Sequence, residues 1–196
     1  MTCDRTMVCQ KKIVKHPIVI VGDSGILALV GKISINENIS EIVSLGKANL
    51  IDVRKHSKFK TENYSRGLFV LHGGGNGPKE MGVEKTVQEI TRCMREVHEK
   101  NMSVAVIGIL RRPREDDTYE RMRRDVNMKV FKNLMEFKIK CFKMGERNVS
   151  FLDPDCIREN MFGMDGMHLN PEGTEVLGRK VERWVQENCV EVVRTD

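Results

Sequence analysis

Short apolar runs alternate with longer amphipathic segments along this chain. Continuous runs of Val, Ile and Leu are typical of strands that are buried on both faces of a parallel sheet. The first run stops abruptly at Gly22-Asp23-Ser24, and the third leads into a glycine-rich loop at residues 73–77. Five strands are predicted in this way, at residues 17–22, 42–45, 68–71, 104–107 and 149–152.

The segments between these runs have the spacing of helices. Residues 83, 87, 90, 94 and 97 are all apolar and lie three or four positions apart, so they share one face of a helix. Asn170 and Pro171 suit the cap and the first position of a last helix. Further helices are predicted at residues 24–32 and 118–144, and residues 47–58 are ambiguous between a loop and a short helix.

Strand and helix alternate five times, which calls for a parallel sheet with helices on both faces and right-handed crossovers. The expected fold class is α/β, a three-layer α/β/α sandwich with a five-stranded parallel sheet. A length of 196 residues suits a single domain. That domain is expected at residues 17–190, after a flexible N-terminal arm (1–16) and before a C-terminal tail (191–196).

Composition narrows the class of protein. Hydrophobic residues make up 40% and charged residues 31% of the sequence, as in soluble globular proteins. No apolar run is long enough to span a bilayer, and residues 1–15 lack the apolar core of a signal peptide. We therefore expect an intracellular, cytoplasmic protein. The six cysteines form no C-x-x-C pair, so free thiols are expected, and neither a zinc site nor a cofactor is predicted.

The chain is mildly basic, with a net charge of +5 and a pI near 8.9. Basic residues cluster at positions 111–114 and 121–124. A solvated surface is the common explanation for such clusters, and nucleic-acid binding is the alternative. No aromatic residues interleave the two clusters to stack on bases.

The end of the first strand, Gly22-Asp23-Ser24, is the first candidate for chemistry. In open α/β sheets, reactive groups lie just beyond the carboxyl ends of the strands. Ser24 is expected at that edge and at the start of a helix, whose free N–H groups favour developing negative charge. The alternative is that Ser24 only caps the helix. A base and an oxyanion site elsewhere in the chain would favour the catalytic interpretation.

A base and oxyanion donors are supplied by three further loops, which contain Gly46, Asn76 and residues 165–168. Asp165 and His168 are three positions apart, so they would face the same side of a helix-like turn. The carboxylate can then accept a hydrogen bond from one imidazole nitrogen and leave the other free to act as a base toward a serine. The candidate oxyanion donors are the backbone N–H groups of Ser24 and Gly46 and the side-chain amide of Asn76.

These residues fall into four blocks that resemble those of the SGNH (GDSL-type) hydrolases, a family of serine esterases, lipases and acetylhydrolases. The resemblance runs over residues 17–187, with the blocks in the family's order and spacing. It implies a flavodoxin-like SGNH hydrolase fold, catalysis by Ser24, Asp165 and His168, and an oxyanion hole of Ser24, Gly46 and Asn76. The blocks are Gly22-Asp23-Ser24, Gly46, Gly74-Gly75-Asn76 and Asp165-Gly166-Met167-His168.

Two positions depart from the family pattern. Gly25 follows the serine, where a bulky residue is usual. Gly77 stands where the third block usually has an aspartate that braces the loop. Within the family, the chain looks most like the esterase-like domains of first-open-reading-frame proteins from animal non-LTR retrotransposons.

The predicted function is hydrolysis of a carboxylic ester, an acyl or acetyl ester, through an acyl-enzyme on Ser24. Lipid, acetylated-sugar and thioester substrates all remain open, and so does the oligomeric state. The alternative is a weakly active or inactive binding or assembly module of retroelement origin, associated with nucleic acid through residues 111–124. A trypsin-like protease is excluded because only His16 precedes Ser24, and a Rossmann site would need a glycine fingerprint after the first strand.

Overall fold

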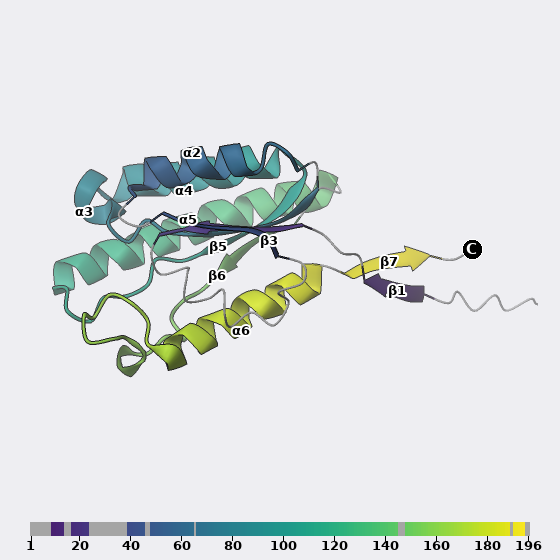
Figure 1. Ribbon diagram of the computed structural model, residues 1–196. Coiled ribbons are helices and arrows are strands. Elements are labelled where there is room, and N and C mark those ends of the chain that lie inside the picture. The colour runs from purple at the N-terminus through teal and green to yellow at the C-terminus, as the bar shows by residue number, and fades with distance from the viewer. Residues whose placement is uncertain are drawn as a thin grey trace, which may run out of the picture.

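A parallel sheet of five strands forms the middle layer of the protein (Figure 1). The computed structural model describes residues 9–13, 17–23, 39–45, 48–64, 66–144, 148–188 and 190–194. All neighbouring strands of the sheet run parallel, in the order β3-β2-β4-β5-β6. This order is the flavodoxin-like one, and it confirms the predicted fold class. The strands are β2 (Ile18–Gly22), β3 (Ile39–Ser44), β4 (Gly67–His72), β5 (Met102–Ile107) and β6 (Val149–Leu152).

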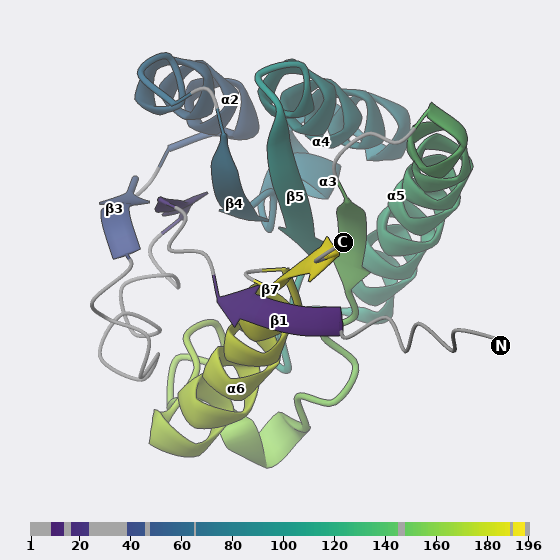
Figure 2. The same ribbon diagram turned by 90° about the vertical axis from the view of Figure 1, so that its right-hand side faces the viewer.

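Helices cover both faces of the sheet (Figure 1, Figure 2). Three of them, α2 (Leu50–Lys60), α4 (Val83–His98) and α5 (Asp117–Met144), lie on one face, and α6 (Pro171–Asn188) lies on the other. Two short helices, α3 (Gly77–Met81) and the 3-10 helix η3 (Glu159–Met161), lie in the connections. None of the helices in the described ranges is both long enough and apolar enough to cross a membrane.

Alternate side chains of the strands build two separate cores. Val19 and Phe69 are buried on the side of α2, α4 and α5. Ile20 and Val70 point the opposite way and are buried with Trp184 of α6. Since both faces of the central strands are buried, their sequences are continuous apolar runs instead of alternating patterns. The packed sheet also fixes the positions of the loops at its edge.

The helices agree with most of the sequence predictions. Those expected at residues 83–97 and 118–144 are present, and the last helix begins at Pro171. The ambiguous residues 47–58 contain most of α2, whose first turn is capped by Asn49: its side-chain oxygen accepts a hydrogen bond from a backbone N–H at 3.0 Å. The helix predicted at residues 24–32 lies outside the described residues.

Two strand assignments differ from expectation. The second strand, β3, begins at Ile39 rather than at residue 42, because the polar Ser40 and Glu41 interrupt its apolar pattern. Outside the main sheet, β1 (Cys9–Ile13) pairs antiparallel with β7 (Val190–Arg194) (Figure 1). The sequence predicted an arm and a tail there, because two adjacent lysines in β1 give no alternating pattern. The domain boundary at residues 17–190 stays a prediction.

Candidate active site

A cavity of about 460 Å³ opens at the carboxyl ends of the parallel strands. Helix α3, which contributes Gly77 and Glu80 to its lining, lies at the end of the molecule opposite the β1–β7 ribbon (Figure 1). The loops after β2, β4 and β5 surround the cavity, together with the start of α2 and the loop before α6. This is the edge at which an open α/β sheet places its functional groups. The lining consists of Asp23, Glu80 and residues 48–50, 72–77, 109–112 and 167–169.

Asp165 and His168 form a hydrogen-bonded pair at this cavity. Nδ1 of His168 lies 2.5 Å from Oδ2 of Asp165. Oδ1 of the same carboxylate accepts hydrogen bonds from the backbone N–H groups of Met167 at 2.9 Å and His168 at 3.0 Å. These hydrogen bonds, first of all the one from the His168 ring, hold the pKa of Asp165 well below its usual range. The carboxylate is therefore ionised, and it orients the imidazole with Nε2 directed away from it.

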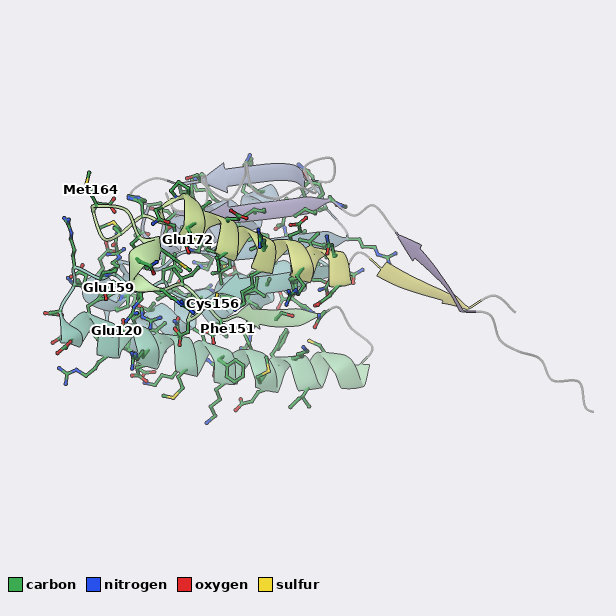
Figure 3. The ribbon with its side chains drawn as sticks, turned by 90° about the horizontal axis from the view of Figure 1, so that it is seen from below. Glu120, Phe151, Cys156, Glu159, Met164 and Glu172 are labelled. Carbon is green, nitrogen blue, oxygen red and sulfur yellow. The ribbon has the colours of Figure 1, made fainter. Side chains whose placement is uncertain are left out.

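A tight turn between η3 and α6 holds this pair. The N–H of Gly163 donates to the carbonyl of His168 at 2.8 Å, which closes the turn. Gly166 has a φ of +64°, in the left-handed region that favours glycine. The predicted contact is thus present, although the turn is not the helix-like one expected. Figure 3 shows Met164 at the outer tip of this loop, where it is 92% exposed.

Asn76 lies at the edge of the cavity, between β4 and α3. The sharp bend before it requires Gly74, whose φ is +91°. The side-chain oxygen of Asn76 accepts a hydrogen bond from Nη2 of Arg112 at 2.8 Å. Because a guanidinium can only donate, the oxygen of the amide must face Arg112 and the nitrogen must point away from it. Among the described residues nothing accepts a hydrogen bond from this nitrogen, so it is available to an atom in the cavity.

Ser24 and Gly46 lie outside the described residues, so the roles predicted for them stay predictions. The residues beside them are described. Asp23 lines the cavity, and its N–H donates to the carbonyl of the last residue of β4 at 3.2 Å. Leu45 donates its N–H to the carbonyl of Gly22 at 2.8 Å. The segments that lead to Ser24 and Gly46 are therefore joined to each other and to β4.

A second histidine–carboxylate pair, not predicted from the sequence, also lines the cavity. Nδ1 of His72 lies 3.1 Å from Oδ1 of Asp23. His72 is the last residue of β4 and is only 5% exposed. The side chain of His168 is 48% exposed and can be reached by a substrate. His72 and Asp23 are far apart in the sequence, so no spacing pattern could have revealed this pair.

One wall of the cavity is held in place from α5. The side chain of Asn127 accepts a hydrogen bond from the N–H of Ile109 at 2.8 Å and donates to its carbonyl at 3.0 Å. Nη1 of Arg123 donates to the same carbonyl at 2.9 Å, and its Nε and Nη2 bind the two oxygens of Glu120. Arg123 is only 3% exposed. Its predicted place in a basic surface is therefore wrong, because it is a buried, ion-paired support of the wall.

We expect Glu120→Gln to destabilise the protein in a pH-dependent way. The hydrogen bonds from Arg123 lower the pKa of Glu120 from 4.5 to about 2. A carboxylate with a lowered pKa stabilises the folded state above its unfolded pKa, and this stabilisation is lost as the pH falls through the lowered value. Since Glu120 is partly exposed, we expect a loss of only about 1 kcal/mol in the free energy of unfolding near neutral pH. Urea unfolding of both proteins over a pH series measures it.

The matched control for this measurement is Glu159→Gln, an exposed glutamate on η3 (Figure 3). It should leave the free energy of unfolding close to that of the parent at every pH. The difference between Glu120→Gln and the parent should shrink between pH 4.5 and about 2. A difference that stays constant over that range would contradict the role of the Arg123–Glu120 ion pair.

The described residues place neither a thiol nor a metal-binding group at this site. Cys93, Cys141 and Cys156 are free thiols, as expected, and none of these three lines the cavity. Burial raises the pKa of Cys93 to about 12, so it is an inert thiol at neutral pH. Within the described ranges, no three His, Cys, Asp or Glu side chains are grouped so that they could hold a metal ion.

Neither a protein-family model nor a curated protein matches this sequence. Solved structures do match its fold. A carbohydrate esterase family 3 protein from Talaromyces cellulolyticus gives a TM-score of 0.66 at 14% identity, over 89% of this chain and 98% of that chain. A GDSL-like lipase from Bacteroides thetaiotaomicron gives 0.64 at 13% identity, over 88% and 89% of the two chains.

A third match is a psychrotrophic esterase from Pseudoalteromonas sp., in a structure inhibited by monoethylphosphonate. It gives a TM-score of 0.58 at 13% identity, over 86% of this chain and 98% of that chain. At such low identity the shared property is the arrangement of strands and helices. The chain has the five-stranded parallel α/β fold that these esterases and this lipase also have.

Proposed function

We propose that this protein is a serine ester hydrolase of the SGNH type, with Ser24 as its nucleophile. One observation carries the proposal: the Asp165–His168 pair, the Asn76 amide and the segment ending at Asp23 meet around one cavity. They supply a base with its orienting carboxylate, an oxyanion donor and the residue that directly precedes the nucleophile. The likeness of the fold to esterases and a GDSL-like lipase supports the same assignment.

In the first half-reaction, Oγ of Ser24 attacks the carbonyl carbon of the ester while Nε2 of His168 takes its proton. Asp165 binds Nδ1 of His168 and stabilises the imidazolium that forms. The negative charge on the carbonyl oxygen is met by the Asn76 amide and by the backbone N–H groups of Ser24 and Gly46. His168 then protonates the departing alcohol, and the acyl group remains on Ser24.

Water completes the cycle through the same groups. His168 takes a proton from the water molecule, whose oxygen attacks the acyl carbonyl. The tetrahedral intermediate again places its charge in the oxyanion site. When it breaks down, the carboxylic acid leaves and His168 returns the proton to Ser24. Both half-reactions begin with Nε2 unprotonated, which is why the orientation set by Asp165 matters twice.

The cavity favours a small and largely apolar acyl group. Leu50, Ile109 and Leu169 supply apolar surface, and the glycines of the β4–α3 loop leave the backbone open to a ligand. A volume of about 460 Å³ is in the range of small-molecule sites. Lipid, acetylated-sugar and thioester substrates all carry an acyl group, and we propose a short one for this protein.

Covalent labelling tests the proposed nucleophile. A fluorophosphonate probe phosphonylates an activated serine and stays attached to it. We expect the parent to be labelled by the probe and to hydrolyse p-nitrophenyl butyrate. Ser24→Ala should show neither labelling nor hydrolysis. Ser150→Ala, on β6 and not among the residues that line the cavity, is the matched control and should retain them. Equal labelling of Ser24→Ala and the parent, or attachment at another residue in a mass spectrum, would rule out Ser24.

The alternative function, a binding or assembly module related to retrotransposon first-open-reading-frame proteins, has less support. Its basic region was predicted to bind nucleic acid, but Arg123 is buried and shares Glu120 with Arg124. Arg121 is exposed and donates to a backbone carbonyl of its own helix. Salt-dependent binding of single-stranded nucleic acid by the parent that weakens in the double variant Arg121→Glu/Arg124→Glu would favour this module. Equal binding by the parent and the double variant would count against it.

A further inference from the structure

We propose that Arg112 positions the Asn76 side chain as an oxyanion donor, taking the place of the aspartate that SGNH hydrolases usually have at position 77. The inference rests on the proposed function, because it concerns the oxyanion site of the same cavity. Arg112 lies in the loop after β5 and lines the cavity. The sequence predicted it only as a member of a basic cluster.

The guanidinium of Arg112 is held on several sides. Nη2 donates to Oδ1 of Asn76 at 2.8 Å, and Nη1 lies 3.8 Å from a carboxylate oxygen of Glu115. Its Cζ lies 5.4 Å from the ring centroid of Tyr119, as in a cation–π contact. Only 12% of the side chain is exposed. A planar group fixed in this way keeps Nη2 directed at Asn76, so it selects one of the two orientations of the Asn76 amide.

Tyr119 connects the same arrangement to the backbone of the loop. Its hydroxyl donates to the carbonyl of Gly75 at 3.0 Å. Burial raises the pKa of Tyr119 to about 12, so the hydroxyl keeps its proton at neutral pH. Arg112 therefore lies against a ring that is anchored to the residue before Asn76. The positive charge beside the amide oxygen also polarises the amide and strengthens its N–H groups as donors.

The packing at position 77 shows why the support must come from elsewhere. Gly77 is buried at the start of α3, and a Cβ there would lie 2.8 Å from Cγ2 and from Oγ1 of Thr86. Thr86 is fully buried, and its hydroxyl donates to the carbonyl of Gly82 at 2.7 Å, so it has little room to move. An aspartate at position 77 would not fit unless α3 and α4 repacked.

Gly75 offers a way to displace the guanidinium without replacing it. A Cβ on Gly75 would lie 2.6 Å from Nη2 of Arg112, the atom that donates to Asn76. That atom is at the far end of a long side chain, so it can be displaced without a shift of the backbone. Gly75 is not among the described glycines with positive φ, so an alanine suits its backbone.

We expect Gly75→Ala and Arg112→Met each to lower kcat for p-nitrophenyl butyrate by about 10- to 100-fold, with KM within about threefold of the parent. In an Asn76→Ala background neither change should lower kcat further, because no amide remains to be positioned. Arg112→Lys should restore part of the activity, since a lysine can still donate one hydrogen bond. Arg121→Met, at an exposed position of α5, is the control and should keep the kcat of the parent.

A second measurement does not depend on turnover. Nuclear magnetic relaxation of the Asn76 side-chain amide should show a rigid group in the parent and a mobile one in Arg112→Met and Gly75→Ala. Unchanged kcat in Arg112→Met, or an equal further loss in the Asn76→Ala background, would overturn the inference, as would equal amide mobility in all three proteins. If the parent is neither labelled by the fluorophosphonate probe nor active, the proposed function is contradicted instead. The mobility of the Asn76 amide then tests separately whether Arg112 positions that side chain.

Discussion

Replacing His168 with alanine is expected to lower kcat for a short-chain p-nitrophenyl ester by about ten thousandfold. Without the imidazole no group takes the proton of the serine hydroxyl, which is a weak nucleophile at neutral pH. Nδ1 of this ring lies 2.5 Å from Oδ2 of Asp165, so the ring is already oriented in the absence of substrate. Steady-state hydrolysis by purified parent and variant measures the effect.

Two other histidines serve as comparisons for this experiment. His56→Ala, at an exposed position of α2, should retain the kcat of the parent. His72 is the stricter comparison because it also pairs with a carboxylate, at 3.1 Å from Asp23. It is buried, so we expect His72→Gln to affect stability more than kcat. Lost turnover in His72→Gln together with full turnover in His168→Ala would identify the His72–Asp23 pair as the one that contains the base.

The sheet could be predicted because its strands are buried on both faces. Runs such as the one that contains Val19 and Ile20 are apolar at every position, and the order of runs and helices then determines a parallel α/β fold. The predicted start of β3, residue 42, lies after its observed start at Ile39 because the polar Ser40 and Glu41 break that pattern. The pairing of β1 with β7 could not be predicted because the two segments are far apart in the sequence and β1 contains the polar run Gln10-Lys11-Lys12.

Within the candidate site, local contacts could be predicted and distant ones could not. Asp165 and His168 are three positions apart, so a turn alone brings them together. The bond from Arg112 to Asn76 joins residues that are 36 positions apart. It depends on how the loops after β4 and β5 meet at the edge of the sheet, which no spacing in the sequence reveals. No spacing in the sequence reveals the role of Arg123 either, which is buried and supports the loop after β5 through its hydrogen bond to the carbonyl of Ile109.

Asp165→Asn is expected to lower kcat about a thousandfold while the fold stays intact. The carboxylate has two tasks: Oδ1 accepts from the N–H groups of Met167 and His168, and Oδ2 binds Nδ1 of His168. The carbonyl oxygen of an asparagine can perform the first task. Its NH2 group then faces Nδ1 and forces the ring proton onto Nε2, which can no longer accept the proton of the serine. Ester hydrolysis and thermal unfolding measure the two effects separately.

The pH dependence makes this prediction more specific. Hydrogen bonds from His168 and Met167 hold the pKa of Asp165 below its usual range, so the carboxylate stays charged until the pH falls through that lowered value. The ratio of kcat between parent and Asp165→Asn should therefore show no step from titration of Asp165 between about pH 5 and about pH 9. Glu172→Gln, an exposed carboxylate in the first turn of α6 (Figure 3), should match the parent throughout. A kcat close to that of the parent in Asp165→Asn would mean that His168 acts without its carboxylate partner.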